Sequence, residues 1–160
     1  MIYLTEEHSS QEEMLAWLKQ LENPEFGLIK DSVLQLLQPK VISCDYENRT
    51  AEFAFAVQEW QLNPEKGLHG GIIVTGFDVS FGLLCHYYAK QHMISTISID
   101  TTFLKPVMET DTIHYKVRIN RMGHTIYHLT AEARLERDDI LAAVSNATFM
   151  KLEQTFPTPV

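Results

Sequence analysis

The chain has 160 residues, of which 45% are hydrophobic and 21% charged, and it carries a formal net charge of -8. This length and composition are typical of one globular domain with a substantial core. The acidic balance argues against nucleic acids and anionic membranes as partners, since both favour clustered Lys and Arg. No apolar run reaches the ~20 residues that span a bilayer. With two cysteines and no secretion-type N-terminus, we expect no disulfide framework and a cytoplasmic location.

Residues 1–39 are expected to form an N-terminal helical extension. Ser10 and Glu13 have the spacing of a capping box, and apolar residues then recur at helical intervals until Asn23-Pro24. A shorter helix is expected over residues 31–38, where Pro39 ends it. The extension matches no motif that we can identify.

The hydrophobic period changes to two after residue 40, on both sides of one long apolar stretch. Strands are expected over 41–46, 50–57, 95–104, 114–120, 125–136 and 140–152, with turns at 47–49, 121–124 and 137–139. About six strands and one long helix predict an α+β domain over 40–153, in which an antiparallel sheet curls around the helix. Residues 154–160, with two prolines, are expected to be a frayed tail.

The apolar stretch predicts a helix surrounded by other structure, and Asp78 is its only formal charge. No Lys or Arg lies three or four residues away, so no ion pair within the helix offsets the cost of burying this carboxylate. Asp78 is therefore a candidate general base or nucleophile, against the alternative that it bonds to a nearby hydroxyl such as Thr75. Its face of the helix consists of small residues, namely Gly71, Thr75, Gly82 and Cys85.

Two glycines, Gly70 and Gly71, stand where this helix begins. The first N–H groups of a helix have no internal partner, so they can donate to a carbonyl oxygen that becomes negative. The alternative is that the glycines only shape a tight turn. Gly70 and Asp78 are ~12 Å apart along a helix, too far to share one carbonyl within a single chain. Two antiparallel copies of the helix would unite them, which predicts an obligate homodimer and leaves a tetramer open.

These residues resemble the hotdog-fold acyl-CoA thioesterases, in particular the phenylacetate-pathway branch. The resemblance covers about residues 50 to 152 and depends on Asn63, the run His69-Gly70-Gly71, and Asp78. It implies a hotdog fold, an acyl-CoA substrate and no separate cofactor. It further implies that Asn63 orients the helix start or a water, that the Gly70 N–H polarises the thioester carbonyl, and that Asp78 of the neighbouring subunit activates water or attacks directly. Thr96 is the hydroxyl residue that the branch carries on the next strand.

Substrate-binding residues follow from the same resemblance. His69 and Gly71 are assigned to the substrate surface beside Gly70. Members of the branch often carry Arg or Lys after the hairpin glycine, where the phosphates of CoA can be held, whereas this chain has His124 there. Arg121 and His124 are therefore the candidates on this hairpin; Arg118 and Lys105 are further cations. No His or Cys spacing predicts a metal site.

Two other functions stay open at this point. A hotdog enoyl-CoA hydratase or dehydratase would pair a catalytic His with an acid from a proline-rich loop, and the sequence around His69 lacks such a loop. A noncatalytic acyl-CoA binding module would use the same cleft. Activity on an enoyl-CoA would favour the first alternative, and tight binding of CoA without turnover would favour the second.

Overall fold

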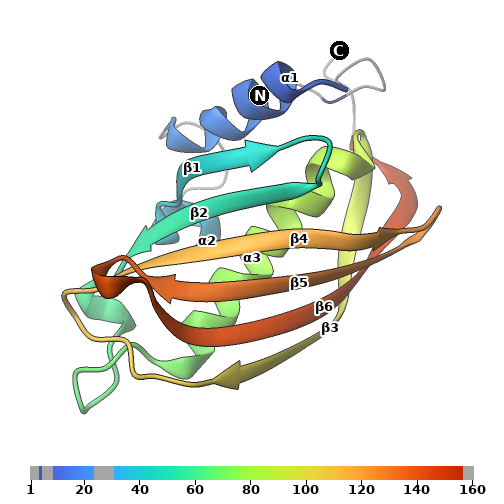
Figure 1. The fold of residues 1–160 in the computed structure, drawn as a ribbon. Helices are drawn as coiled ribbons and strands as arrows, with labels where there is room; N and C mark the ends of the chain where they lie inside the picture. The colour runs from blue at the N-terminus through green and yellow to red at the C-terminus, as the bar shows by residue number, and fades with distance from the viewer. Residues whose placement is uncertain (1–3, 5–8, 24–30, 157–160) are drawn as a thin grey trace.

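The computed structural model describes residue 4, residues 9–23 and residues 31–156. A six-stranded sheet with strand order β1-β2-β4-β5-β6-β3 curls around one long helix, α3, which spans Gly70–Ala89 (Figure 1). Every pair of neighbouring strands is antiparallel. The α+β fold predicted from the hydrophobic period is confirmed. The strands are β1 Lys40–Asp45, β2 Thr50–Ala56, β3 His92–Phe103, β4 Thr112–Met122, β5 Ile126–Leu135 and β6 Ile140–Thr155.

The predicted strands are all present, and the largest differences lie at the ends of β3 and β6. Strand β3 begins at His92, three residues before the expected start, and β6 continues to Thr155, inside the segment expected to be frayed. The two extensions have one cause, because His92 pairs with Thr155. Residues 157–160 lie outside the described part. The short 3-10 helix η2, Glu59–Gln61, was not predicted, and η3, Arg137–Asp139, forms the expected turn.

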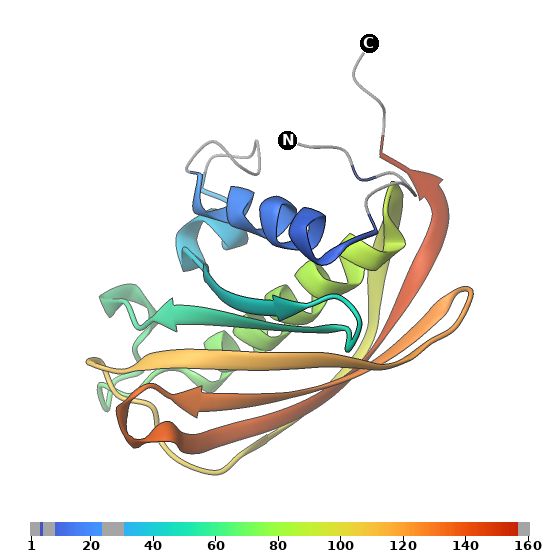
Figure 2. The same ribbon diagram turned by 45° about the horizontal axis from the view of Figure 1, so that its top comes forward.

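The described parts of the N-terminal extension contain helices, as expected, and the first of these covers one edge of the sheet; residues 1–3, 5–8 and 24–30 lie outside the described part. Helix α1 spans Gln11–Lys19 and continues as the 3-10 helix η1, Gln20–Glu22; α2 spans Val33–Leu37. Ser10 caps α1, because its hydroxyl accepts the Glu13 N–H. Figure 2 shows α1 lying over β1, the first strand of the sheet.

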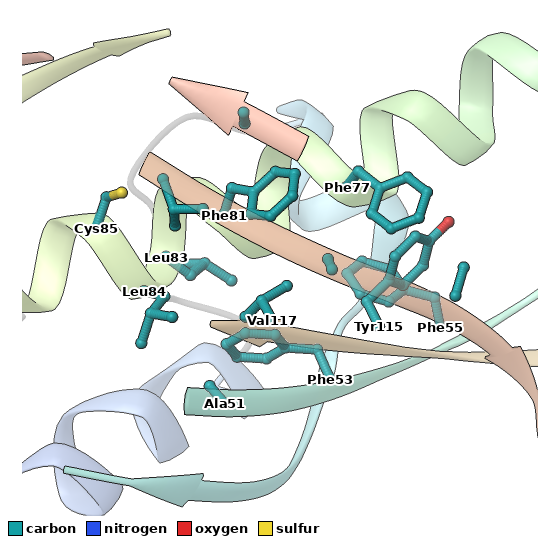
Figure 3. Packing of buried hydrophobic residues seen from close by; sticks show 14 of the residues in the cluster. Ala51, Phe53, Phe55, Phe77, Phe81, Leu83, Leu84, Cys85, Tyr115 and Val117 are labelled. Atoms are coloured by element: carbon teal, nitrogen blue, oxygen red, sulfur yellow. The ribbon is translucent and has the colours of Figure 1, made fainter. Parts of the chain in front are cut away.

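The core lies between α3 and the inner face of the sheet, where Phe77 and Phe81 are fully buried (Figure 3). Tyr115 of β4 lies against Gly76, and its hydroxyl donates to the Ile73 carbonyl oxygen at 3.1 Å. A Cβ atom added to Gly76 would lie 2.3 Å from the Tyr115 hydroxyl oxygen. A glycine is therefore required for this close approach of ring and helix.

Helix α3 has 20 residues and is apolar enough, by length and composition, to cross a bilayer, a property that was not expected from the sequence. However, 56% of its apolar window is buried inside this chain. The same composition is expected of a helix surrounded by a sheet. We therefore interpret α3 as the core helix of the domain.

Candidate functional site

The start of α3 leaves one backbone donor unused. The Gly71 N–H donates to Nδ1 of His69 at 2.9 Å, and the N–H groups of Ile72 and Ile73 donate to the His69 carbonyl oxygen. Within the described part of the chain, the Gly70 N–H has no partner. Of the two glycines singled out in the sequence, Gly70 therefore retains the capacity to donate to a ligand, whereas Gly71 completes the helix cap.

His69 acts here as the N-cap residue of α3. Because its Nδ1 accepts the Gly71 N–H, a neutral ring carries its proton on Nε2. The ring is exposed. This arrangement commits Nδ1 to the helix cap, which argues against His69 as the catalytic base of a hydratase.

Asn63 orders the loop that leads into the helix. Its side-chain oxygen Oδ1 accepts the N–H groups of Glu65 at 3.0 Å and Gly67 at 2.9 Å, and its own N–H donates to the Gly67 carbonyl oxygen at 2.8 Å. The two accepted bonds fix which side-chain atom is oxygen. No described residue accepts a hydrogen bond from Nδ2. Asn63 therefore both shapes the loop and keeps two side-chain donors.

Asn63 and Gly70 line the same open pocket, which has a volume of about 380 Å³. Its other wall is the end of β3 and the segment that follows, including the half-exposed ring of Phe103. Among the described residues that line it, Lys105 is the only charged one. The pocket is lined by Asn63, Gly67, Leu68, Gly70, Ile73, Phe103, Leu104, Lys105, Pro106 and Val107. Asp78 and Thr96 do not line it.

Asp78 lies further along α3 and has a partner. The hydroxyl of Thr96 on β3 donates to Asp78 Oδ1 at 2.9 Å. Asp78 is half-buried, so the full burial expected from the sequence is corrected. No Lys or Arg of the described chain forms an ion pair with it, and its partner is a hydroxyl. The alternative partner, Thr75, instead donates to the Gly71 carbonyl oxygen at 2.8 Å. The structure thus places the Thr96 hydroxyl and the Asp78 carboxylate in one hydrogen-bonded pair, which is called the acidic pair below.

The face of α3 that carries Asp78 is partly open. Gly71 is exposed and Thr75 is half-buried, which agrees with a stripe that a ligand or a second backbone can approach. Cys85 does not belong to it: its side chain is fully buried, and burial raises the pKa of the thiol. A protonated, buried thiol is a poor nucleophile, so Asp78 is the remaining candidate on this face.

The hairpin candidates Arg121 and His124 lie at the other end of the molecule from Gly70. The β4–β5 hairpin is at the end of the sheet where α3 finishes and β3 begins (Figure 1). His124 is exposed, and its Nδ1 lies 3.4 Å from the Thr125 hydroxyl. Within one chain, the structure brings neither residue to the pocket at Gly70.

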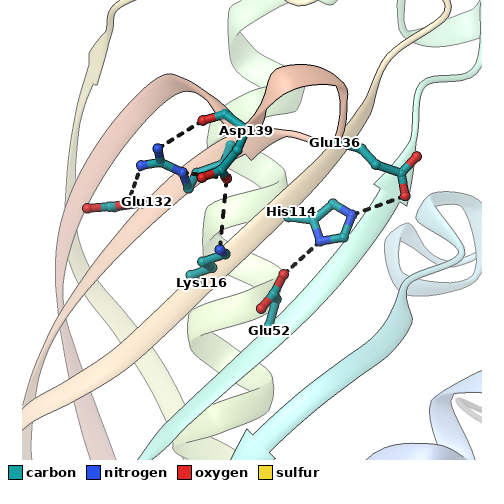
Figure 4. A network of polar contacts seen from close by, with 7 residues as sticks. Glu52, His114, Lys116, Glu132, Glu136 and Asp139 are labelled. Carbon is teal, nitrogen blue, oxygen red and sulfur yellow. Dashed lines mark hydrogen bonds and ion pairs between the residues drawn. The ribbon is translucent and has the colours of Figure 1, made fainter.

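Two further polar regions lie apart from this pocket. On β2 and β4, Nδ1 of His114 is 2.7 Å from a Glu52 carboxylate oxygen, within a network of ionisable side chains (Figure 4). A hollow of about 460 Å³ is lined by Lys116 and Arg118 together with Asp100 and Glu132, so its charges are mixed. Among the described residues, no group of His, Cys, Asp and Glu side chains could hold a metal ion.

The sheet wrapped around a single helix, with these residues at its start, is the hotdog fold. A family model for the Thioesterase superfamily matches residues 66–142, within this hotdog domain. No curated protein sequence matches the chain.

Solved structures agree with this assignment of the fold. The PaaI protein of the phenylacetic acid degradation operon of E. coli superposes with a TM-score of 0.74 at 19% identity, covering 91% of this chain and 99% of that one. A putative thioesterase, a phenylacetic acid degradation-related protein from Ralstonia eutropha, has a TM-score of 0.69 at 22% identity and covers 79% and 95%. An acyl-CoA hydrolase from Staphylococcus aureus, solved with butyryl coenzyme A, has a TM-score of 0.59 at 21% identity and covers 68% and 66%.

Sequence reasoning did not assign Phe103 to the site. Its ring lies over Gly70, within 3.4 Å of where a Cβ atom on that glycine would be. The only local signal was an aromatic residue at the end of a predicted strand. Which helix position it meets depends on the pairing of β3 with β6, which is not visible in the sequence.

Proposed function

We propose that this protein hydrolyses an acyl-CoA thioester to the free acid and CoA, at sites shared between two antiparallel copies of α3. Each site would take Gly70 and Asn63 from one subunit and the Asp78–Thr96 pair from its partner. One observation carries the proposal: the unused Gly70 N–H and the Asp78 carboxylate lie on one helix, eight positions apart, and only Gly70 lines the pocket.

The proposed chemistry uses the free hydrogen-bonding atoms described above. The thioester carbonyl oxygen would accept from the Gly70 N–H and from Asn63 Nδ2, so that these donors stabilise the oxyanion. The carboxylate of Asp78 takes a proton from water as the water oxygen bonds to the carbonyl carbon. Collapse of the intermediate breaks the carbon–sulfur bond, and the thiolate recovers the proton from Asp78. Thr96 occupies Oδ1 and leaves Oδ2 to face the water.

A second route is direct attack of the Asp78 carboxylate on the carbonyl carbon, which forms an anhydride that water then opens. Single-turnover hydrolysis in isotopically labelled water separates the two routes. Direct attack expels the thiolate, and when water then opens the anhydride at the Asp78 carbonyl carbon, an unlabelled oxygen from the protein leaves in the product acid. Activation of water places only solvent oxygen there.

The main test is Asp78→Asn, with hydrolysis of a panel of acyl-CoA thioesters as the measurement. We expect kcat to fall by roughly 10²–10⁴, because the amide cannot accept the proton, while the melting temperature stays close to that of the wild type. Asp100→Asn is the matched control, since Asp100 is an exposed carboxylate on the same strand as Thr96 and lines the outer hollow. Unchanged turnover in Asp78→Asn would remove the proposal.

The shared site is tested by mixing two inactive variants, Asp78→Asn and Asn63→Ala. Random exchange of subunits should restore about a quarter of the wild-type activity, because half of the dimers are mixed and each mixed dimer holds one intact site. A site built within one subunit would instead give no recovery.

A further inference from the structure

Strand β3 contains one extra residue beside the acidic pair. Its pairing with β6 shifts between Thr96, which is opposite Phe149, and Ser98, which is opposite Thr148. Ile97 is therefore a residue without an opposite partner, and its side chain is 52% exposed. Such a bulge changes which side chains face each side of the sheet beyond it.

The contacts of β3 show this change of face. Before the bulge, the even-numbered Thr96 bonds to Asp78 on α3. After the bulge, the odd-numbered Thr101 lies 2.9 Å from the hydroxyl of the buried Ser145, and the ring of the odd-numbered Phe103 lies over Gly70. In a regular strand, Thr96 and Phe103 would point to opposite faces. The extra residue puts both on the side of α3.

Phe103 is a large apolar side chain that stays 51% exposed next to an unused polar donor. It lines the same pocket as Asn63 and Gly70. If a thioester carbonyl is held at Gly70, its acyl carbons begin one bond from the carbonyl carbon, within reach of this ring. An acyl group lying on the ring would remove apolar surface of both partners from water.

We propose that Phe103 is the wall of the acyl pocket, and that the bulge at Ile97 sets Phe103 and Thr96 on the same side of β3. This inference rests on the thioester hydrolysis proposed above. The bulge then has a geometric role, because it lets one strand supply a contact at the oxyanion donor and a hydroxyl at the carboxylate, which belong to the two halves of the site.

Phe103→Ala tests the wall, with Phe103→Leu and Met93→Ala beside it. Met93 is also an exposed apolar residue of β3, at 38%, and does not line the pocket. The substrates are the acetyl, butyryl, hexanoyl and phenylacetyl thioesters of CoA. Phe103→Ala should lower kcat/KM roughly tenfold for the larger acyl groups and only slightly for acetyl. Phe103→Leu should recover part of the loss, and Met93→Ala should change nothing.

The same panel separates the two levels of the proposal. If the wild type hydrolyses thioesters but Phe103→Ala lowers kcat/KM equally for every acyl group, or leaves it unchanged, the acyl wall is wrong and the hydrolase stands. If the wild type hydrolyses none of them, both proposals fail.

Deletion of Ile97 tests the bulge, with Ile97→Ser as the control that keeps the residue count. We expect the deletion either to abolish the dependence on acyl size or to lower kcat at least tenfold, because Phe103 and Thr96 can no longer share a face. Ile97→Ser should keep both properties within about threefold. A folded deletion variant with wild-type kcat and acyl selectivity would overturn the assignment. If the deletion does not fold, the Phe103 series still decides whether the ring contacts the acyl group.

Discussion

The two edges of the sheet differ in whether other parts of the chain cover them. At the β1 edge, side chains of the N-terminal helix bond to the free backbone groups: Gln11 donates to the Cys44 carbonyl oxygen at 2.9 Å and accepts from the Tyr46 N–H at 2.8 Å, while Lys19 donates to the Val41 carbonyl oxygen at 3.1 Å. At the β3 edge, no strand of the described chain pairs with the outer side.

This difference indicates at which edge a strand of a second chain can pair with the sheet. An uncovered edge offers a row of unpaired N–H and carbonyl groups to another strand, and proteins usually protect such edges. Here α1 protects β1, whereas β3 spans 12 residues and no strand of the described chain covers its outer side. Strand β3, which forms this uncovered edge, also supplies Thr96 and Phe103. The comparison leaves β3 as the edge at which a second chain can add, and three variants at the β1 edge test whether α1 protects the other one.

The largest effect is expected from Trp17→Ala, which loosens the cover of the β1 edge. Trp17 is 4% exposed and its ring lies 5.6 Å from that of His86 and 5.9 Å from that of Tyr87. Loss of this buried ring should lower the free energy of unfolding by about 3–5 kcal/mol, measured with urea, without changing kcat of the folded fraction. Leu15→Ala, on the exposed side of α1, is the control. If Trp17→Ala lowered the free energy of unfolding only as much as Leu15→Ala, α1 would be only loosely packed on the domain.

A smaller effect is expected when the polar cover alone is removed, in the double variant Gln11→Ala, Lys19→Ala. Two carbonyl oxygens of β1 and the N–H of Tyr46, the residue that follows it, then lose their partners, at a cost of about 1–3 kcal/mol. Because the edge becomes available to other strands, sedimentation should reveal assemblies larger than those of the wild type. Glu12→Ala, an exposed change on the same helix, should leave sedimentation unaltered. Identical sedimentation of the double variant would contradict the protective role of α1.

The smallest effect concerns pH and His86, which lies between Trp17 and Phe156. Burial lowers the pKa of His86, a shift only partly opposed by a backbone hydrogen bond, and Nδ1 has no partner in the described structure. Above an unfolded-state pKa of about 6.5, both states are neutral and stability is complete. As the pH falls below that value, the unfolded chain binds the proton first, so stability declines until the folded-state pKa is passed.

His86→Phe should remove this part of the acid sensitivity. The difference in unfolding free energy between wild type and variant should therefore change as the pH falls below about 6.5, with a slope of at most about 1.4 kcal/mol per pH unit. Urea unfolding at several pH values measures it. A constant difference over that range would mean that His86 does not couple the cover of the β1 edge to protonation.

Local patterns were enough to predict much of the fold. The hydrophobic periods gave all six strands and the central helix, and the Ser10 cap was visible as a capping box. Pairing between distant segments was not visible. The cover of β1 by Gln11 and Lys19 depends on side chains that meet backbone groups more than 20 residues away. The periods of two in each strand do not specify which strand lies at an edge.

The candidate site was predicted in part, and the limits have physical reasons. The helix start at Gly70 followed from helix geometry, but the use of the Gly71 N–H by His69 depends on a ring orientation that sequence does not encode visibly. Thr96 came from a family resemblance, because its distance to Asp78 is set by the packing of β3 on α3. Phe103 was missed because one bulge reverses the face on which it lies.

The contact between Gly76 and Tyr115 has a consequence for sequence divergence. The ring occupies the place of any side chain at position 76, so a larger residue there requires a smaller one at position 115. The phenol would then also give up its bond to the Ile73 carbonyl oxygen. We therefore expect positions 76 and 115 to change together among related proteins, and neither to change alone.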